Sequence, residues 1–130
     1  TAYFPWPVDT LFYGHSLEEC RSLIGTAVRR VLGDAPQIET DLPPQVEVTV
    51  HTQPSSNATL VHLVNSSGHQ DRSFHPALPI HDRTLSIRVD QPIQSVRSAA
   101  LDRDLEFTQS DGRIRFALPR LELLDLLILR

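Results

Sequence analysis

The sequence contains no methionine, no lysine and no long hydrophobic run. Its twelve basic residues are all arginines, scattered along the chain and outnumbered by sixteen acidic residues, which gives a formal net charge of −4. Because nucleic-acid-binding domains present a basic face to the phosphate backbone, we expect no nucleic-acid partner. A membrane-spanning helix needs roughly 18 apolar residues in succession, and no stretch approaches this length, so we expect no membrane association either.

Cysteine is also scarce. The single thiol, Cys20, excludes an internal disulfide and cannot form a zinc site by itself. It leaves the compartment undetermined, and a cytoplasmic location is the one we favour. Since methionine is absent and the first residues lack the charged head and apolar stretch of a signal peptide, we expect the sequence to be cut from a longer protein.

The residues that are present suffice for one folded domain. With 130 residues, of which 40% are hydrophobic and 22% charged, the composition is that of a soluble globular protein. The pattern changes character near residue 42. Before this point, five of the eight aromatic residues fall within the first thirteen positions, interrupted by prolines. This composition predicts a short strand and a packed loop.

A helix is predicted to follow, beginning at Leu17. Ser16 and Glu19 have the spacing of a capping box, in which each side chain bonds a free backbone N–H of the first turn. Apolar residues at spacings of three and four form one broad face: Leu17, Cys20, Leu23, Ile24, Ala27, Val28, Val31 and Leu32. Cys20 is therefore predicted to be a buried core residue, not a reactive thiolate. Gly33 is predicted to end the helix.

The remainder of the sequence has the pattern of β-strands. Prolines and acidic residues over 36–44 predict a linker or crossing loop. Strands are predicted over 45–52, with one polar face, and over 59–65, which is apolar on both faces and so central in a sheet. A turn at 54–57 joins them as a hairpin. Residues 66–82 are too rich in Gly, Pro and His to form a strand, and they predict a long loop.

Further strands are expected in the second half of the chain. Their marker residues are Leu85, Ile87 and Val89; Val96 and Ser98; Leu105 and Phe107; and Ile114, Phe116 and Leu118. Asp111 and Gly112 predict a tight turn, because this pair supplies positive φ angles. The leucine-rich segment 121–129 has the length of a helix or a strand, and Pro119 favours a strand. The predicted fold class is mostly β: an antiparallel β-sandwich of six or seven strands preceded by a strand-loop-helix segment.

Six short segments resemble parts of a known family. Residues 3–6 (with Asp9) and 27–33 resemble the last strand and helix of the flavodoxin-like β-galactosidase trimerisation domain. The segments 61–65, 79–82, 96–98 and 116–123 resemble the small β-sandwich that follows it. The resemblance implies that residues 1–42 are the tail of the flavodoxin-like domain, and that residues 43–130 are the C-terminal β-sandwich domain.

In this family both modules occur at the C-terminus of glycoside hydrolases of the β-galactosidase and fucosidase-like kind. The catalytic carboxylates of such enzymes lie at the ends of the strands of an N-terminal (β/α)8 barrel, and this sequence contains no barrel. The resemblance therefore implies no catalytic residue, no cofactor and no metal in this chain. It implies a non-catalytic accessory domain that braces neighbouring domains or subunits.

The six histidines leave a metal-dependent enzyme as one alternative. The groups that could converge in the predicted loop are His69, Asp71, His75, His81 and Asp82. Their spacing matches no zinc signature, and the simpler interpretation is that His81 and Asp82 cap a turn. His62 lies between two apolar residues of a strand, where we expect a hydrogen-bonded or interface histidine.

A carbohydrate-binding module is the other alternative, because pyranose rings stack on exposed aromatic side chains. The candidate contacts with a glycan or a partner surface are Tyr3, Trp6, Tyr13, His62, His81 and Asp82. We also expect contacts with the remaining domains of the parent chain and a homo-oligomer formed through residues 3–32, because a sandwich of about 85 residues cannot cover so much apolar surface. Asn57 and Asn65 begin glycosylation sequons, a pattern that often arises by chance.

Overall fold

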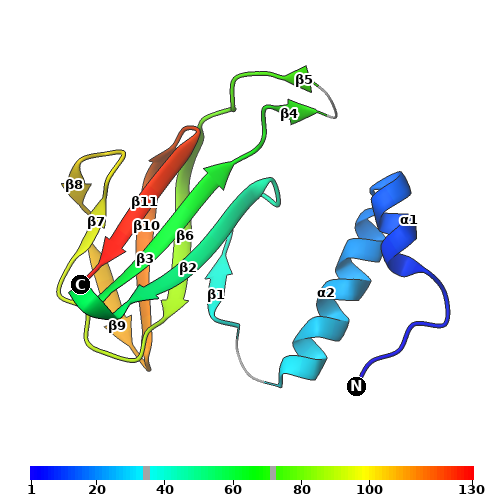
Figure 1. Ribbon diagram of the computed structural model, residues 1–130, viewed down its shortest axis with the longest axis horizontal. Helices are drawn as coiled ribbons and strands as arrows, with labels where there is room; N and C mark the ends of the chain where they lie inside the picture. The colour runs from blue at the N-terminus through cyan, green and yellow to red at the C-terminus, as the bar shows by residue number, and fades with distance from the viewer. Residues whose placement is uncertain (34–35, 71–72) are drawn as a thin grey trace. The chain divides into compact units, whose positions relative to one another are not determined.

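The chain forms two compact units, Thr1–Gln37 and Ile38–Arg130, which Figure 1 shows as helices and strands respectively. The structure, a computed structural model, describes residues 1–33, 36–70 and 73–130. The first unit consists of α1 (Val8–His15) and α2 (Glu18–Leu32). Neither helix combines the length and apolar character needed to cross a membrane.

The start of the chain differs from its predicted structure. Residues 1–7 form no strand, and Phe12 and Tyr13 lie within helix α1, so the predicted strand and packed loop are wrong. Ser16 ends α1 in the left-handed conformation (φ 51°), and its N–H donates to the Phe12 carbonyl at 2.7 Å. The capping-box prediction is also wrong, since an N-cap residue needs an extended backbone; Leu17 occupies the N-cap of α2 without a side-chain bond. Gly33 ends α2 as predicted, at φ 70°.

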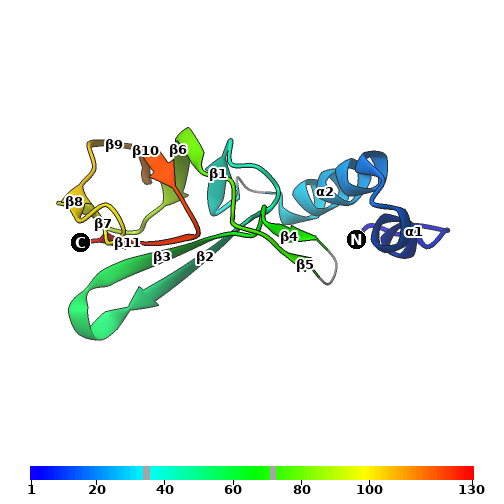
Figure 2. The ribbon, with the colours of Figure 1, turned by 90° about the horizontal axis from the view of Figure 1, so that it is seen from above.

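The second unit is a β-sandwich. Its five-stranded sheet has the order β2-β3-β11-β7-β8, with β2 (Val46–Gln53), β3 (Ala58–Asn65), β11 (Leu124–Leu129), β7 (Val96–Ser98) and β8 (Arg103–Asp104). Its four-stranded sheet has the order β1-β6-β10-β9, with β1 (Ile38–Thr40), β6 (Ile80–Arg88), β10 (Arg113–Leu121) and β9 (Phe107–Ser110). Every pair of neighbouring strands is antiparallel. Figure 2 shows the two layers, one with β2, β3 and β11 and the other with β1, β6 and β10.

The predicted fold class is therefore confirmed, although the two sheets contain more strands than the six or seven expected. Period-two burial builds the core, because alternate residues of each strand face the opposite sheet. The fully buried side chains include Val61, Leu63, Leu85, Ile87, Val96, Ile114, Leu118, Leu121, Leu127 and Leu129. Burying one such side chain contributes about 1.5–3 kcal/mol. The leucine-rich segment is a strand because its leucines alternate between the core and the outer face.

Three loop or burial predictions need correction. The predicted linker contains β1, whose residues pair with β6. The predicted long loop contains a small two-stranded sheet, β4 (His69–Gln70) and β5 (Ser73–Phe74), and also the start of β6. The outer face of β3 is not buried: His62 and Val64 are exposed, because no second layer among the described residues of this unit covers that side of the sheet.

Both predicted hairpin turns are present. The β2–β3 hairpin turns through a 3-10 helix, η1 (Pro54–Ser56), and Asn57 at φ 48°. The β9–β10 hairpin turns at Asp111 (φ 50°) and Gly112 (φ 70°), which are the two positive φ angles that a tight hairpin needs. These turns set the register of the strands that bear the core residues.

Candidate functional site

The apolar face of α2 is exposed in the first unit. The helix buries none of its residues, and in the described part of this unit only Val8 is buried. Val28, Val31 and Leu32 are 50%, 56% and 58% exposed. Cys20 is half-buried, so its prediction as a buried residue is wrong. The reason is that few residues of the first unit pack against the helix face on which Cys20 lies. A face of this kind is typical of a surface that packs against another element.

Two hollows lie along this face. One, of about 460 Å³, is lined by Thr1, Ala2, Phe4, Ile24, Ala27, Val28, Val31 and Leu32. The other, of about 520 Å³, is lined by residues 2–9 and Ile24. Tyr3 and Trp6, two of the sequence candidates, both line this second hollow and are 85% and 54% exposed. Tyr13, on α1, is 92% exposed and lies outside both hollows.

The polar side of α2 contains a local ion pair. The Nε of Arg21 donates to an Oε of Glu18 at 2.7 Å, and a second guanidinium nitrogen contacts the other carboxylate oxygen. This hydrogen bond lowers the pKa of Glu18 and raises that of Arg21. The pair joins residues one helical turn apart and so supports the first turn of α2.

His62 lies on the outer face of the five-stranded sheet. Its ring meets the ring of His51, on β2, edge to face, with 5.6 Å between centroids. Both side chains are exposed. His51 is not among the candidate residues predicted from sequence, although its position in the alternating β2 pattern places it on the outer face.

His81 and Asp82 belong to β6, in the other sheet, so the structure does not bring them together with His62. Their prediction as a turn cap is wrong. His81 pairs with Arg120 in the β6–β10 register, and Asp82 adopts φ 51° beside the gap that this ladder has at Pro119. Proline has no N–H to donate, which accounts for the local break in the ladder. Both candidate side chains are exposed.

The remaining histidines of the metal hypothesis lie near the small β4–β5 sheet. His69 stacks on Phe74, with 4.9 Å between ring centroids, and Phe74 is 82% exposed. Asp71, the carboxylate proposed between them, lies outside the described residues. Among residues 1–33, 36–70 and 73–130, no three His, Cys, Asp or Glu side chains are grouped so as to hold a metal ion.

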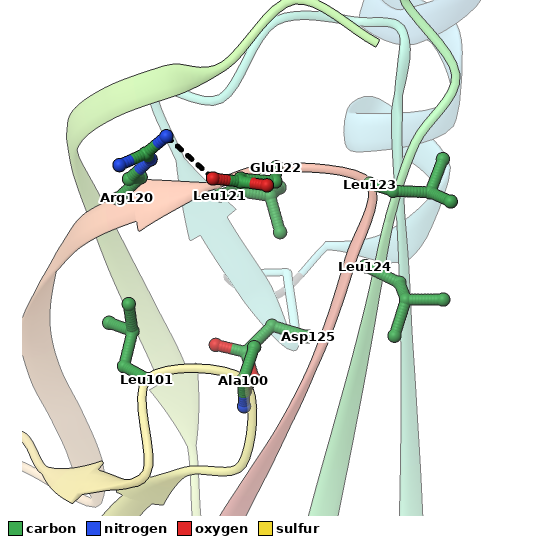
Figure 3. Close-up of a pocket in the computed structure, with 8 residues that line it drawn as sticks. All are labelled: Ala100, Leu101, Arg120, Leu121, Glu122, Leu123, Leu124 and Asp125. Carbon is green, nitrogen blue, oxygen red and sulfur yellow. Dashed lines mark hydrogen bonds and ion pairs between the residues drawn. The ribbon is translucent and has the colours of Figure 1, made fainter. Parts of the chain in front are cut away.

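A hollow of about 380 Å³ lies where β10 leads into β11 (Figure 3). Its rim bears the ion pair between Arg120 and Glu122, at 2.5 Å. Asp125 points toward the turn at Ala100, whereas the neighbouring Leu123 and Leu124 point the other way. The Asp125 carboxylate is buried, and both its oxygens accept hydrogen bonds from within the protein. It therefore holds a turn in place and does not face this hollow as an open carboxylate.

The two sequons occupy different environments. Asn65 is 1% exposed, and its Nδ2 donates to the carbonyls of Leu78 and Glu122 at 2.8 and 2.7 Å. Its Oδ1 accepts from the N–H of Ser67 at 3.1 Å. Asn65 is thus a structural link between three chain segments, whereas Asn57 is exposed on the β2–β3 turn.

Comparison with known proteins gives structural similarity alone. No family model matches the sequence, and no curated protein matches it. The fold is similar to α-L-fucosidase isoenzyme 2 from Paenibacillus thiaminolyticus, with a TM-score of 0.88 and 21% identity, over 98% of this chain and 20% of that one. It is also similar to a cycloisomaltooligosaccharide glucanotransferase from Paenibacillus sp., complexed with cycloisomaltoheptaose, with a TM-score of 0.61 and 21% identity, over 73% of this chain and 17% of that one. The chain thus spans about a fifth of each of these proteins, and such identities show the fold alone.

Proposed function

We propose that this chain is a non-catalytic accessory module of a glycoside hydrolase. In this proposal, the helical unit Thr1–Gln37 is the end of a preceding domain, and the sandwich Ile38–Arg130, which includes β1, is a C-terminal domain that braces it. The structural neighbours support the proposal, because both are carbohydrate-active enzymes by name and the chain covers only a small share of each.

The observation that carries the proposal is the exposed apolar face of α2. A 15-residue helix without one buried residue gains little stability from its own unit. In globular proteins, most of the stability of a helix comes from packing its apolar face, so α2 requires a partner surface. A neighbouring domain of the parent chain supplies that surface in our proposal.

The reading frame upstream of Thr1 is the first test. We expect it to encode a barrel-sized series of βα units. A frame that encodes no such units would overturn the proposal.

The second test compares hydrogen exchange of α2 in the 130-residue chain and in the longer protein. Amide exchange over residues 18–32 should slow at least tenfold in the longer protein, because docking suppresses local opening. Val31→Asp should abolish this protection, since it places a charge on the docked face. Thr26→Asp, which makes the same charge change at an exposed polar position beside Arg29, is the matched control and should preserve it. Equal exchange in the two proteins would contradict the docking role.

A second candidate function, carbohydrate binding, is favoured by the hollow that Tyr3 and Trp6 share. Exposed aromatic rings can stack on the C–H faces of pyranoses. Isomaltooligosaccharides are a suitable probe, and binding should change the fluorescence of Trp6, the single tryptophan. Tyr13→Ala, outside the hollow, should leave the titration unchanged, whereas Tyr3→Ala should weaken it. An unchanged fluorescence signal up to millimolar sugar would remove this candidate.

A further inference from the structure

The strand β2 presents an unpaired edge. It is the first strand of the five-stranded sheet, and among the described residues no strand pairs with it on the side away from β3. Its sequence, VEVTVHTQ, contains no proline, glycine or lysine, the residues that commonly block a sheet edge. An open edge of eight residues is a template for pairing with a further strand.

The register of β2 on β3 determines which backbone groups point to this edge. The carbonyl of Gln45 accepts from the N–H of Ser66 at 3.0 Å, so the odd-numbered residues of β2 bond to β3. By the antiparallel alternation, the N–H and C=O groups of Val48, Val50 and Thr52 point to the open edge.

We propose that β2 pairs antiparallel with β2 of a second copy of this chain, about a two-fold axis at Thr49. In such a pair, residues whose backbone groups point to the edge must lie opposite residues of the same kind in the second copy. Among the registers that allow this, the two with the longest overlap are centred on Thr49 and on Val50. Centred on Thr49, Val48 exchanges backbone hydrogen bonds with Val50 of the second copy. The same register places Glu47 opposite His51.

Donor–acceptor complementarity between the Glu47 carboxylate and the His51 imidazole distinguishes the two registers. Glu47 and His51 are exposed on the same face of β2. Because the axis is two-fold, Glu47 of each copy lies opposite His51 of the other copy, which gives two such pairs. Both pairs occupy non-hydrogen-bonded positions, where opposing side chains approach most closely. Centred on Val50 instead, Glu47 would face Gln53 and His51 would face Thr49, with no acid–base pair. A second copy therefore matches this edge in backbone hydrogen bonding, in length and in the pairing of a carboxylate with an imidazole.

Sedimentation equilibrium of the 130-residue chain tests the proposal. From micromolar to millimolar concentration, the mass should rise from 14.6 kDa toward twice that value. His51→Glu places two like-charged pairs across the axis and should raise the dissociation constant about tenfold. Glu47→His combined with His51→Glu exchanges the partners and should restore the original affinity.

Val31→Asp, on α2, is the control for association through the helices and should leave this dimer unchanged. A chain that stays monomeric throughout, or a double variant as weak as His51→Glu alone, would overturn the proposal.

Disulfide trapping tests the register independently. In a Cys20→Ser background, Thr49→Cys brings two thiols together on the axis, at a Cα separation of about 4.5 Å that a disulfide accommodates. Gln53→Cys, at the end of the strand, is the matched control. Mild oxidation should give a covalent dimer from the first variant and not from the second. Equal cross-linking of both variants, or of neither, would overturn the proposed axis.

Discussion

Asp125, on β11, accepts a hydrogen bond of 2.5 Å from the hydroxyl of Ser98, on the neighbouring strand β7. Its second carboxylate oxygen accepts from the N–H of Ala100 at 2.9 Å, and the Ser98 oxygen accepts from the N–H of Leu101 at 3.1 Å. Asp125 and Ser98 are both buried. The pair thus fastens the turn after β7 to β11.

Replacing Asp125 with alanine should lower the free energy of unfolding by about 1–3 kcal/mol, because it leaves the Ser98 hydroxyl and the Ala100 N–H without their acceptor. Urea denaturation measures this loss. Asp104→Ala is the matched control: Asp104 is an exposed partner of Arg97 at 3.6 Å, and removing it should cost less than about 1 kcal/mol. An equal loss in both variants would contradict the structural role of Asp125.

Replacing Asn65 with aspartate should be destabilising at neutral pH, by about 1–3 kcal/mol, because a carboxylate would face the two carbonyls that now accept from the amide. The same repulsion and burial raise the pKa of the new carboxyl in the folded state. The deficit relative to the natural chain should therefore shrink as the pH falls and the group becomes protonated. Chemical denaturation at neutral and acidic pH measures it, and a pH-independent deficit would contradict this explanation.

Gly68 should not tolerate a side chain. A Cβ at this position would lie 2.1 Å from the carbonyl oxygen of His75, a backbone atom that cannot move aside without displacing the β4–β5 sheet. Gly68→Ala should lower the free energy of unfolding by about 1–3 kcal/mol and shift the NMR signals of His69 and Phe74. Gly14→Ala, on α1, is the control, since its Cβ would meet nothing within 4 Å; it should be neutral or stabilising.

Acid should weaken the first turn of α2 through Glu18. The Arg21 hydrogen bond holds the pKa of Glu18 below its ordinary value of 4.5. Because folding lowers the pKa of this carboxyl, the ionised group stabilises the folded form at pH values above the ordinary pKa. This stabilisation is lost as the pH falls through the pKa of the folded state. The Arg21 Nε–H NMR signal should follow this titration. It should become insensitive to acid in Glu18→Gln and remain sensitive in Glu19→Gln; a titration that survives Glu18→Gln would contradict the assignment.

Several parts of the fold could be predicted from local pattern because their causes are local. Alternation predicted β10 with Ile114, Phe116 and Leu118 facing the core, and the Asp111–Gly112 pair predicted the turn before it. The same reasoning failed at Ser16, where serine fits equally well at the end of one helix and at the start of the next. Only the left-handed backbone at Ser16 decides between them.

The candidate site was less predictable, because proximity across a fold is not a local property. His62, His81 and Asp82 are all predicted contacts with a glycan or a partner surface, yet His62 lies in the five-stranded sheet and the other two lie in the four-stranded sheet. Asp125 is not among the predicted residues, because a lone aspartate in a leucine-rich strand has no distinguishing pattern. The role of Asp125 arises only when β7 lies beside β11 and brings Ser98 to its carboxylate.

The sequence by itself determined the mostly β class, the main hairpins and the broad apolar face of α2, since these depend on the spacing of residues along one strand or helix. The tertiary structure alone decided which strands are neighbours, which edge of β2 is open and which polar groups are buried together. Those properties depend on the pairing of distant segments, whose free energy comes from a shared core and shared hydrogen bonds and is not contained in any one segment.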